Sequence, residues 1–127
     1  MPKARILVIE DNPDNYELVK FLLEQADYAV TGASDGLTGL KCCQDEHPDL
    51  VLLDMTIPEM DGWHLAFRLK ADEATRDIVV VALTAHTLPG DRKKALDAGC
   101  DGYISKPLDV AHFNETIADY LARGANR

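Results

Sequence analysis

The sequence has few of the residues that staple small extracellular domains or anchor a chain in a membrane. Only three of its 127 residues are cysteines, with Cys42 and Cys43 adjacent and Cys100 alone, so neither a disulfide framework nor a CxxC metal site fits the spacing. We expect all three to be small core or helix residues. The longest uninterrupted apolar run, 78–83, is far shorter than the ~20 residues that cross a bilayer, and the run at 6–9 is too short for the core of a signal peptide. These absences predict a cytoplasmic protein that spans no membrane.

Positive charge is also scarce. The chain has 13 Lys and Arg against 22 Asp and Glu, a net charge of −9 with neutral histidine, and its longest basic block is 92–94. Binding to a phosphate backbone depends on cationic side chains that displace counterions, so this charge balance argues against a nucleic-acid-binding protein. The length and the 46% hydrophobic content suit one folded domain with its own core. We therefore expect a single domain over residues 1–127, with a core of about 4–122.

Five short apolar runs alternate with segments of helical periodicity. The runs cover residues 5–9, 28–33, 50–53, 78–83 and 102–105. Apolar residues between them recur every three or four positions, which is typical of amphipathic helices. Because parallel strands need a crossover and a helix supplies it, the alternation predicts a parallel sheet covered on both faces. We predict the α/β class: a three-layer (βα)5 sandwich, flavodoxin-like, with a five-stranded sheet of order 2-1-3-4-5.

Several residues mark where the helices begin and end. Asn12 followed by Pro13 is typical of an N-cap with proline at the first helical position. Ser34 is the predicted cap of the second helix, whose apolar positions Leu37, Leu40 and Cys43 recur every three residues. The remaining predicted boundaries are Gly62 at the start of a third helix, Gly99 at the end of a fourth and Asp109 as the cap of the last.

Polar residues stand where the predicted strands end. The first strand is followed by Glu10 and Asp11, the third by Asp54, the fourth ends at Thr84, and the fifth is followed by Lys106. In an open parallel sheet, ligands bind beyond the carboxyl ends of the strands, so these side chains should converge. Two carboxylates ~4 Å apart repel by about 4 kcal/mol at an effective dielectric constant of ~20, which a divalent cation and a lysine would offset. Oxygen ligands suit Mg²⁺, which also binds phosphate oxygens. A lone Asp after a strand is more often a helix cap, and a lone Thr or Lys there is unremarkable, but together these residues predict a magnesium and phosphoryl site.

The same residues resemble those of the receiver domains of two-component response regulators. The resemblance runs from Arg5 to about Leu121. It rests on the acidic pair Glu10 and Asp11, the segment DMTIPEMDG at 54–62, LTA at 83–85 and YISKP at 103–107. The opening EDNPDN is similar to a subgroup found as free-standing regulators and in hybrid kinases.

The resemblance implies that Asp54 is the phosphoacceptor. Its carboxylate would take a phosphoryl group from a phosphohistidine on a sensor histidine kinase or a histidine phosphotransfer protein, which is nucleophilic catalysis. The implied cofactor is Mg²⁺, with Mn²⁺ as an alternative ion. Its protein ligands would be Asp11, Asp54 and the backbone carbonyl of Thr56, with Glu10 acting through water.

Further roles follow from the same resemblance. Lys106 and Thr84 would contact the phosphoryl oxygens, and a cis peptide between Lys106 and Pro107 would aim the lysine at the site. Thr84 and Tyr103 would form the switch that responds to phosphorylation. Residues two positions after Asp54 and Thr84, namely Thr56 and His86, would tune how fast water removes the phosphoryl group.

The implied protein is a phosphorylation-dependent signalling switch without an output domain. It is not an enzyme for a separate substrate, because it catalyses only its own phosphorylation and dephosphorylation. A downstream partner, whose identity the sequence leaves unknown, would bind the altered surface of the fourth helix, fifth strand and fifth helix, and the chain would be a monomer or a phosphorylation-dependent dimer.

Alternatives remain open. One is a receiver excised from a hybrid kinase or a multidomain regulator. Another is an aspartyl-phosphate phosphatase of the haloacid dehalogenase type, which usually has a second Asp where this sequence has Thr56. A receiver-shaped interaction module that is never phosphorylated is a third, although Glu10, Asp11, Asp54 and Lys106 are all present.

Overall fold

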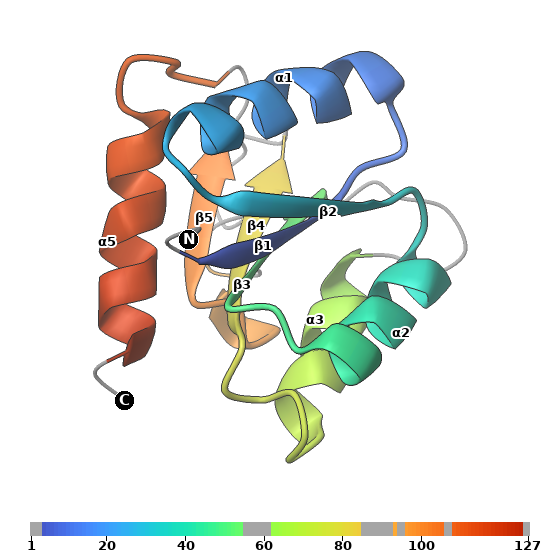
Figure 1. The fold of residues 1–127 in the computed structure, drawn as a ribbon. Coiled ribbons are helices and arrows are strands. Elements are labelled where there is room, and N and C mark those ends of the chain that lie inside the picture. Colours follow the sequence, from blue (N-terminus) through green and yellow to red (C-terminus); the bar gives the residue numbers. More distant parts are fainter. Residues whose placement is uncertain (1–3, 55–61, 85–92, 94–95, 106–107, 126–127) are drawn as a thin grey trace.

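A computed structural model describes residues 4–54, 62–84, 93, 96–105 and 108–125. All described strands belong to one parallel sheet of order β2-β1-β3-β4-β5 (Figure 1). The strands are β1 (Arg5–Ile9), β2 (Ala29–Ala33), β3 (Leu50–Asp54), β4 (Val79–Thr84) and β5 (Gly102–Ser105). The predicted fold class and strand order are confirmed, and the absence of a further domain stays a prediction.

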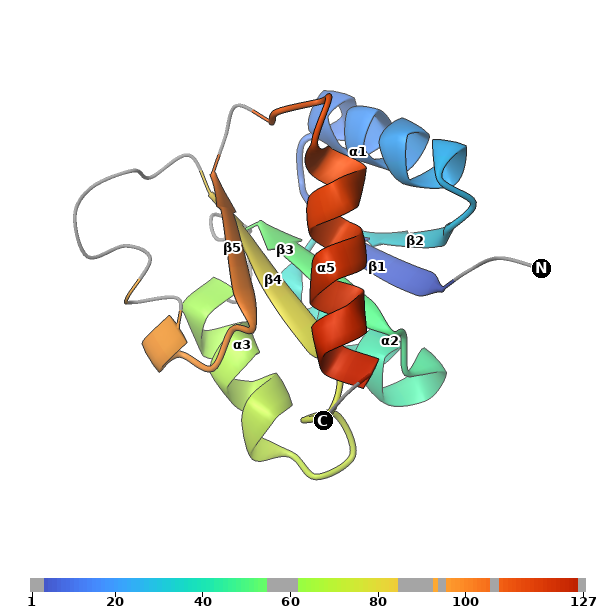
Figure 2. The same ribbon diagram turned by 90° about the vertical axis from the view of Figure 1, so that its left-hand side faces the viewer.

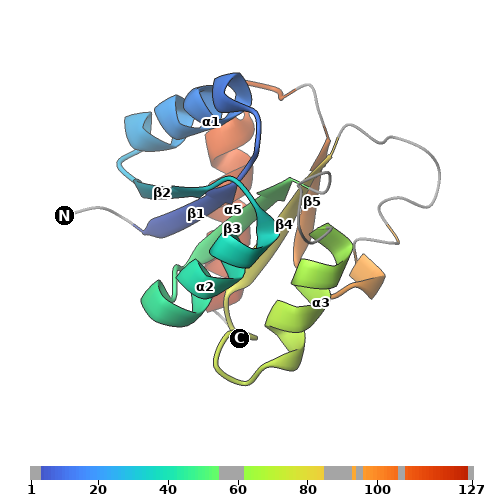
Figure 3. The ribbon, with the colours of Figure 1, turned by 90° about the vertical axis from the view of Figure 1, so that its right-hand side faces the viewer.

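Helices cover both faces of the sheet. Helices α1 (Pro13–Gln25) and α5 (Phe113–Ala125) pack on one face (Figure 2), and α2 (Gly36–Glu46) and α3 (Gly62–Ala71) pack on the other (Figure 3). Each face has its own apolar core, which we call the α1/α5 core and the α2/α3 core. Between β4 and β5, residues 93, 96 and 97 are helical, and the rest of the predicted fourth helix lies outside the described residues.

The central strand β3 is covered by helices on both faces, which explains why its sequence has no alternation of polar and apolar residues. All five of its residues are buried. Leu50 and Leu52 point into the α1/α5 core, while Val51 and Leu53 point into the α2/α3 core, as expected where successive side chains alternate between faces. Burial of each such side chain contributes about 1.5–3 kcal/mol. The strand is therefore a rigid support for the residue at its carboxyl end, Asp54.

Three predicted helix boundaries are confirmed. The Oδ1 of Asn12 accepts hydrogen bonds from the backbone N–H groups of Asp14 (2.9 Å) and Asn15 (3.1 Å), and Pro13 is the first helical residue. Helix α3 begins at Gly62. Gly99 has φ +100°, the left-handed region that favours glycine at a helix end.

The predicted start of the second helix is wrong by one residue. Asp35, not Ser34, is the N-cap of α2, because Asp35 is the extended residue before Gly36 and its Oδ1 accepts the Thr38 N–H at 2.8 Å. Leu37 lies on the outer side of the first turn and is 52% exposed, whereas the other two predicted apolar positions, Leu40 and Cys43, are buried.

The predicted cap of the last helix is also wrong. Helix α5 begins only at Phe113, after a turn formed by residues 110–112. The Asp109 carboxylate instead accepts a hydrogen bond from Nδ1 of His112 at 2.8 Å, which lowers the pKa of Asp109. Asp109 therefore lies in the β5–α5 loop, before the turn that precedes the helix.

The cysteines are core or helix residues, as predicted. All three cysteines are free, with Cys43 and Cys100 buried in the α2/α3 core. Burial raises the pKa of the Cys43 thiol to about 12 and that of Cys100 to about 11. Within the described part of the chain, no helix has the length and apolar character needed to span a membrane.

Candidate metal and phosphoryl site

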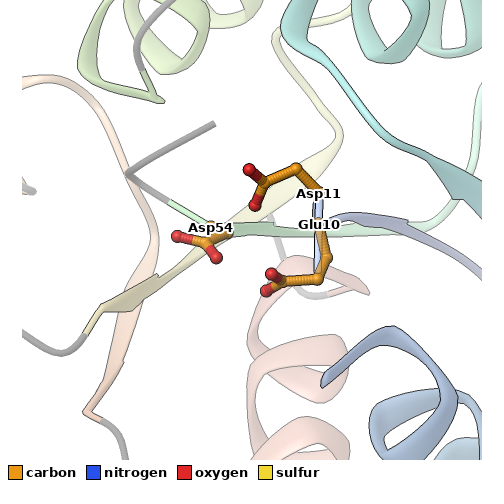
Figure 4. A group of neighbouring side chains, drawn as sticks. All are labelled: Glu10, Asp11 and Asp54. Carbon is orange, nitrogen blue, oxygen red and sulfur yellow. The ribbon is translucent and has the colours of Figure 1, made fainter. Parts of the chain in front are cut away.

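The register of two central strands brings the predicted acidic residues together. Ile9 of β1 pairs with Leu53 of β3, so Glu10 and Asp11 leave the sheet beside Asp54. Carboxylate oxygens of the three residues all lie within 4.8 Å of one another (Figure 4). The predicted convergence at the carboxyl edge of the sheet is therefore present for these three side chains.

Burial differs among the three carboxylates. Glu10 and Asp54 are 4% and 2% exposed, whereas Asp11 is exposed to solvent. The Oε1 of Glu10 accepts the backbone N–H of Asn12 at 3.1 Å, which fixes the Glu10 side chain beneath the start of α1. Acidic groups taken out of water cost several kcal/mol each unless opposite charge compensates them.

The donor set fits a hard divalent cation. It consists of oxygens only, two of the carboxylates are withdrawn from water, and the third remains open to solvent. Mg²⁺ prefers such oxygen ligands, keeps several waters and is usually held by one or two carboxylates. The cluster can therefore hold a divalent cation with coordination positions left for water or a phosphoryl oxygen.

Two cavities lie near opposite edges of the sheet. One, of about 340 Å³, is lined by Glu10, Asp11 and Tyr16, and Tyr16 lies over Gly32 of β2. It therefore lies beside two of the three carboxylates of the acidic cluster. The other, of about 420 Å³, lies at the amino ends of the strands beside the His47–Asp77 pair and takes no part in the predicted site.

The remaining predicted site residues are only partly described. Thr84 is the last residue of β4 and pairs with Ser105, which directly precedes Lys106, so β4 and β5 end at the same edge as the acidic cluster. The side chain of Thr84 lies outside the described part of the structure, as do Thr56, His86, Lys106 and Pro107. Their roles, and the cis peptide, stay predictions.

Tyr103, the predicted switch residue, lies in the edge strand β5. Its half-buried ring packs against the α2/α3 core. Its backbone N–H donates to the hydroxyl of Tyr120 in α5 at 3.3 Å. Tyr120 is not among the residues predicted from the sequence. The available signal was Gly102, since glycine inside a strand marks a close approach by another group.

The fold and the acidic cluster define a flavodoxin-like α/β domain with three carboxylates gathered at the carboxyl edge of its sheet. Residues 6–118 match the sequence model of the response regulator receiver domain, and the chain belongs to this family of two-component signalling domains. The predicted family is thereby confirmed, and the phosphatase alternative loses its basis.

Individual relatives agree with this assignment. The chain is 40% identical over 116 residues to the polar-differentiation response regulator DivK of Brucella ovis, covering 91% of this chain and 94% of DivK. It also resembles the receiver domain of a sensor histidine kinase from Pseudomonas aeruginosa, solved with magnesium in its active-site cleft (TM-score 0.86, 31% identity, 94% of this chain and 98% of that one). The receiver domain of a histidine kinase from Syntrophus aciditrophicus is similar (TM-score 0.87, 31% identity, 94% and 91% covered).

Proposed function

We propose that this receiver domain is switched by phosphorylation of Asp54. The observation that carries the proposal is the approach of the Glu10, Asp11 and Asp54 carboxylates to within 4.8 Å of one another at the end of a fully buried strand. So much negative charge in one place is costly without a cation, and its position suits a ligand beyond the strand ends. The magnesium in the cleft of the Pseudomonas aeruginosa relative supports the same ion here.

The transfer itself is a displacement at phosphorus. An Asp54 carboxylate oxygen attacks the phosphorus of a phosphohistidine, a P–O bond forms, and the P–N bond breaks with its electron pair left on the imidazole nitrogen. Asp11, Asp54 and the Thr56 carbonyl would hold Mg²⁺, or Mn²⁺ in its place, with Glu10 acting through water. Bound there, the cation would neutralise charge on the phosphoryl oxygens.

Other residues of the chain complete the proposed site. The Lys106 ammonium pairs with one phosphoryl oxygen and the Thr84 hydroxyl donates to another, which positions the group for transfer. Water later attacks the phosphorus and releases inorganic phosphate at a rate tuned by Thr56 and His86. The protein thus acts on itself and is not an enzyme for a separate substrate.

The added group then alters a partner surface. A phosphoryl group adds about −1.5 to −2 charges. Thr84 moves toward it, and the Tyr103 ring swings inward behind Thr84. The donor is a sensor histidine kinase or a histidine phosphotransfer protein, and a downstream protein binds the altered surface, either to a monomer or to a phosphorylation-dependent dimer. Because histidine kinases draw their phosphoryl group from ATP, we expect the chain to act in the cytoplasm.

Phosphorylation by a small donor tests the proposal. Acetyl phosphate with Mg²⁺ should add the mass of one phosphoryl group to the intact protein and none to the Asp54→Asn variant. Asp77→Asn is the matched control, since Asp77 is an exposed carboxylate at the opposite edge of the sheet. Equal labelling of Asp54→Asn and wild type, or no labelling of wild type, would overturn the assignment of Asp54.

A further inference from the structure

One side chain of α5 reaches the backbone of the switch strand. Tyr120 lies directly against Gly102 of β5, where any Cβ would come within 2.3 Å of the Tyr120 ring. Its hydroxyl accepts the Tyr103 N–H at 3.3 Å and lies 3.5 Å from the Tyr103 carbonyl oxygen, to which it donates. The glycine therefore provides the space that lets a ring from the helix reach the next residue of the strand.

The position of β5 at the edge of the sheet makes these contacts significant. Among the described strands, β5 pairs with β4 alone, and an edge strand presents backbone groups that no neighbouring strand can bind. Both backbone groups of Tyr103 are directed toward α5 and are held by the same hydroxyl. The Tyr120 hydroxyl thus binds the two backbone groups of Tyr103 that a further strand would bind in the middle of a sheet.

The two tyrosine rings lie on opposite faces of the sheet. The Tyr103 ring packs against the α2/α3 core, whereas the Tyr120 ring packs against the α1/α5 core. The backbone of Tyr103 therefore lies between its own ring on one face and the Tyr120 hydroxyl on the other. A movement of the Tyr103 ring that shifts its backbone must change the hydroxyl contact.

The outer side of the Tyr120 ring contacts Arg123, another residue of α5. The Arg123 guanidinium lies 5.3 Å from the centre of the Tyr120 ring, one helical turn further along, in a cation–π contact. Arg123 is exposed to solvent. A continuous set of contacts therefore runs from Tyr103 through Tyr120 to an exposed cation.

We propose that Tyr120 is a positioning residue that couples the switch residue Tyr103 to the exposed face of α5. The proposal rests on the proposed function, because phosphorylation of Asp54 supplies the movement of Tyr103. Tyr120 holds the β5 backbone in the unphosphorylated protein, and a shift of that backbone on phosphorylation changes the position of the Tyr120 ring and with it the environment of Arg123.

Amide hydrogen exchange tests the contact without phosphorylation. Tyr120→Phe keeps the ring over Gly102 and removes only the hydroxyl, so the Tyr103 amide should exchange about 2- to 10-fold faster while amides of β3 keep their rates. Tyr28→Phe is the matched control, since Tyr28 is a buried tyrosine of the same core that does not touch Tyr103. An unchanged Tyr103 rate in Tyr120→Phe would show that the hydroxyl does not hold the strand.

The coupling is tested on the phosphorylated protein. In wild type treated with acetyl phosphate and Mg²⁺, the NMR resonance of Arg123 Nε–H should shift, and in Tyr120→Phe the shift should fall by at least about twofold at equal phosphoryl incorporation measured by intact mass. Tyr28→Phe should retain the full shift. An equal shift in Tyr120→Phe, or none in phosphorylated wild type, would overturn the coupling while leaving the role of Asp54 intact. If wild type gains no phosphoryl group, the proposed function fails, and the exchange measurement still decides the contact.

Discussion

The Nζ of Lys70 in α3 lies 2.7 Å from Oδ2 of Asp101, the residue that precedes β5. The same ammonium donates to the carbonyl oxygens of Arg76 at 3.1 Å and Ile78 at 2.6 Å, so each of its three N–H groups has an acceptor. Oδ2 of Asp101 also accepts the Val80 N–H at 2.8 Å. One ion pair therefore joins the end of α3 to the starts of β4 and β5.

Loss of the Lys70 ammonium should destabilise the fold. Both side chains are largely buried, and Lys70→Met leaves the Asp101 charge and two carbonyl groups without this donor. We expect the free energy of unfolding in urea to fall by about 2–4 kcal/mol. Lys41→Met, at an exposed position of α2, serves as the control. A loss for Lys70→Met no larger than that of Lys41→Met would contradict the account.

Removal of one carboxylate from the acidic cluster should have opposite effects with and without metal. Asp11→Asn relieves repulsion between groups within 4.8 Å, so without divalent cations we expect it to raise the free energy of unfolding by about 1 kcal/mol. Wild type should gain stability on addition of Mg²⁺, because a ligand that binds only the native state stabilises it, and the variant should gain less. Thermal unfolding with EDTA and with Mg²⁺ measures both effects. Equal gains from Mg²⁺ would contradict the assignment of Asp11 as a ligand.

The three thiols should differ in reactivity. Because burial raises the pKa of Cys43 to about 12 and that of Cys100 to about 11, both remain protonated and inaccessible at pH 8, and the thiolate is the reactive form. Cys42 is half-buried and should react first. Intact mass during alkylation should show one modified thiol before any second addition, and the second and third should appear at a common rate set by opening of the α2/α3 core. Simultaneous modification of all three in the native protein would contradict this order.

Gly39 of α2 should tolerate a methyl group better when Ile9 is shortened. A Cβ at Gly39 would lie 2.4 Å from Cδ1 of Ile9, so Gly39→Ala overpacks the contact and should cost about 1–3 kcal/mol, against a gain in helix propensity of about 1 kcal/mol. Ile9→Val removes that Cδ1 and keeps Cγ1, which would lie 3.0 Å from the added Cβ. Gly39→Ala should therefore destabilise wild type and cost at least about 1 kcal/mol less in the Ile9→Val variant. An equal loss of stability in both backgrounds would contradict the close contact.

The strands and the acidic cluster were predictable because local pattern determines them. Runs such as 50–53 have no polar alternation, which is typical of a strand covered on both faces. Because the carboxyl ends of parallel strands lie at one edge of the sheet, Asp54 was predicted to lie beside Glu10 and Asp11, and it does. No knowledge of distant contacts was needed for either prediction.

The wrong predictions concern features that depend on the backbone conformation or on a residue distant in the sequence. Ser34 and Asp35 both suit an N-cap, and only the backbone shows which one precedes the first helical residue. The core side of α2 is set by the approach of Gly39 to Ile9, which helical periodicity does not reveal. The contact of Tyr120 with Tyr103 depends on the docking angle of α5 against β5.

The location of the phosphoryl group on the chain tests the central claim most directly. After treatment with acetyl phosphate and Mg²⁺, borohydride reduces an aspartyl phosphate to homoserine, and peptide mass mapping identifies the residue that carried it. The account predicts homoserine at position 54 and aspartate at position 11. Homoserine at another position, or none in protein shown by intact mass to be phosphorylated, would contradict it.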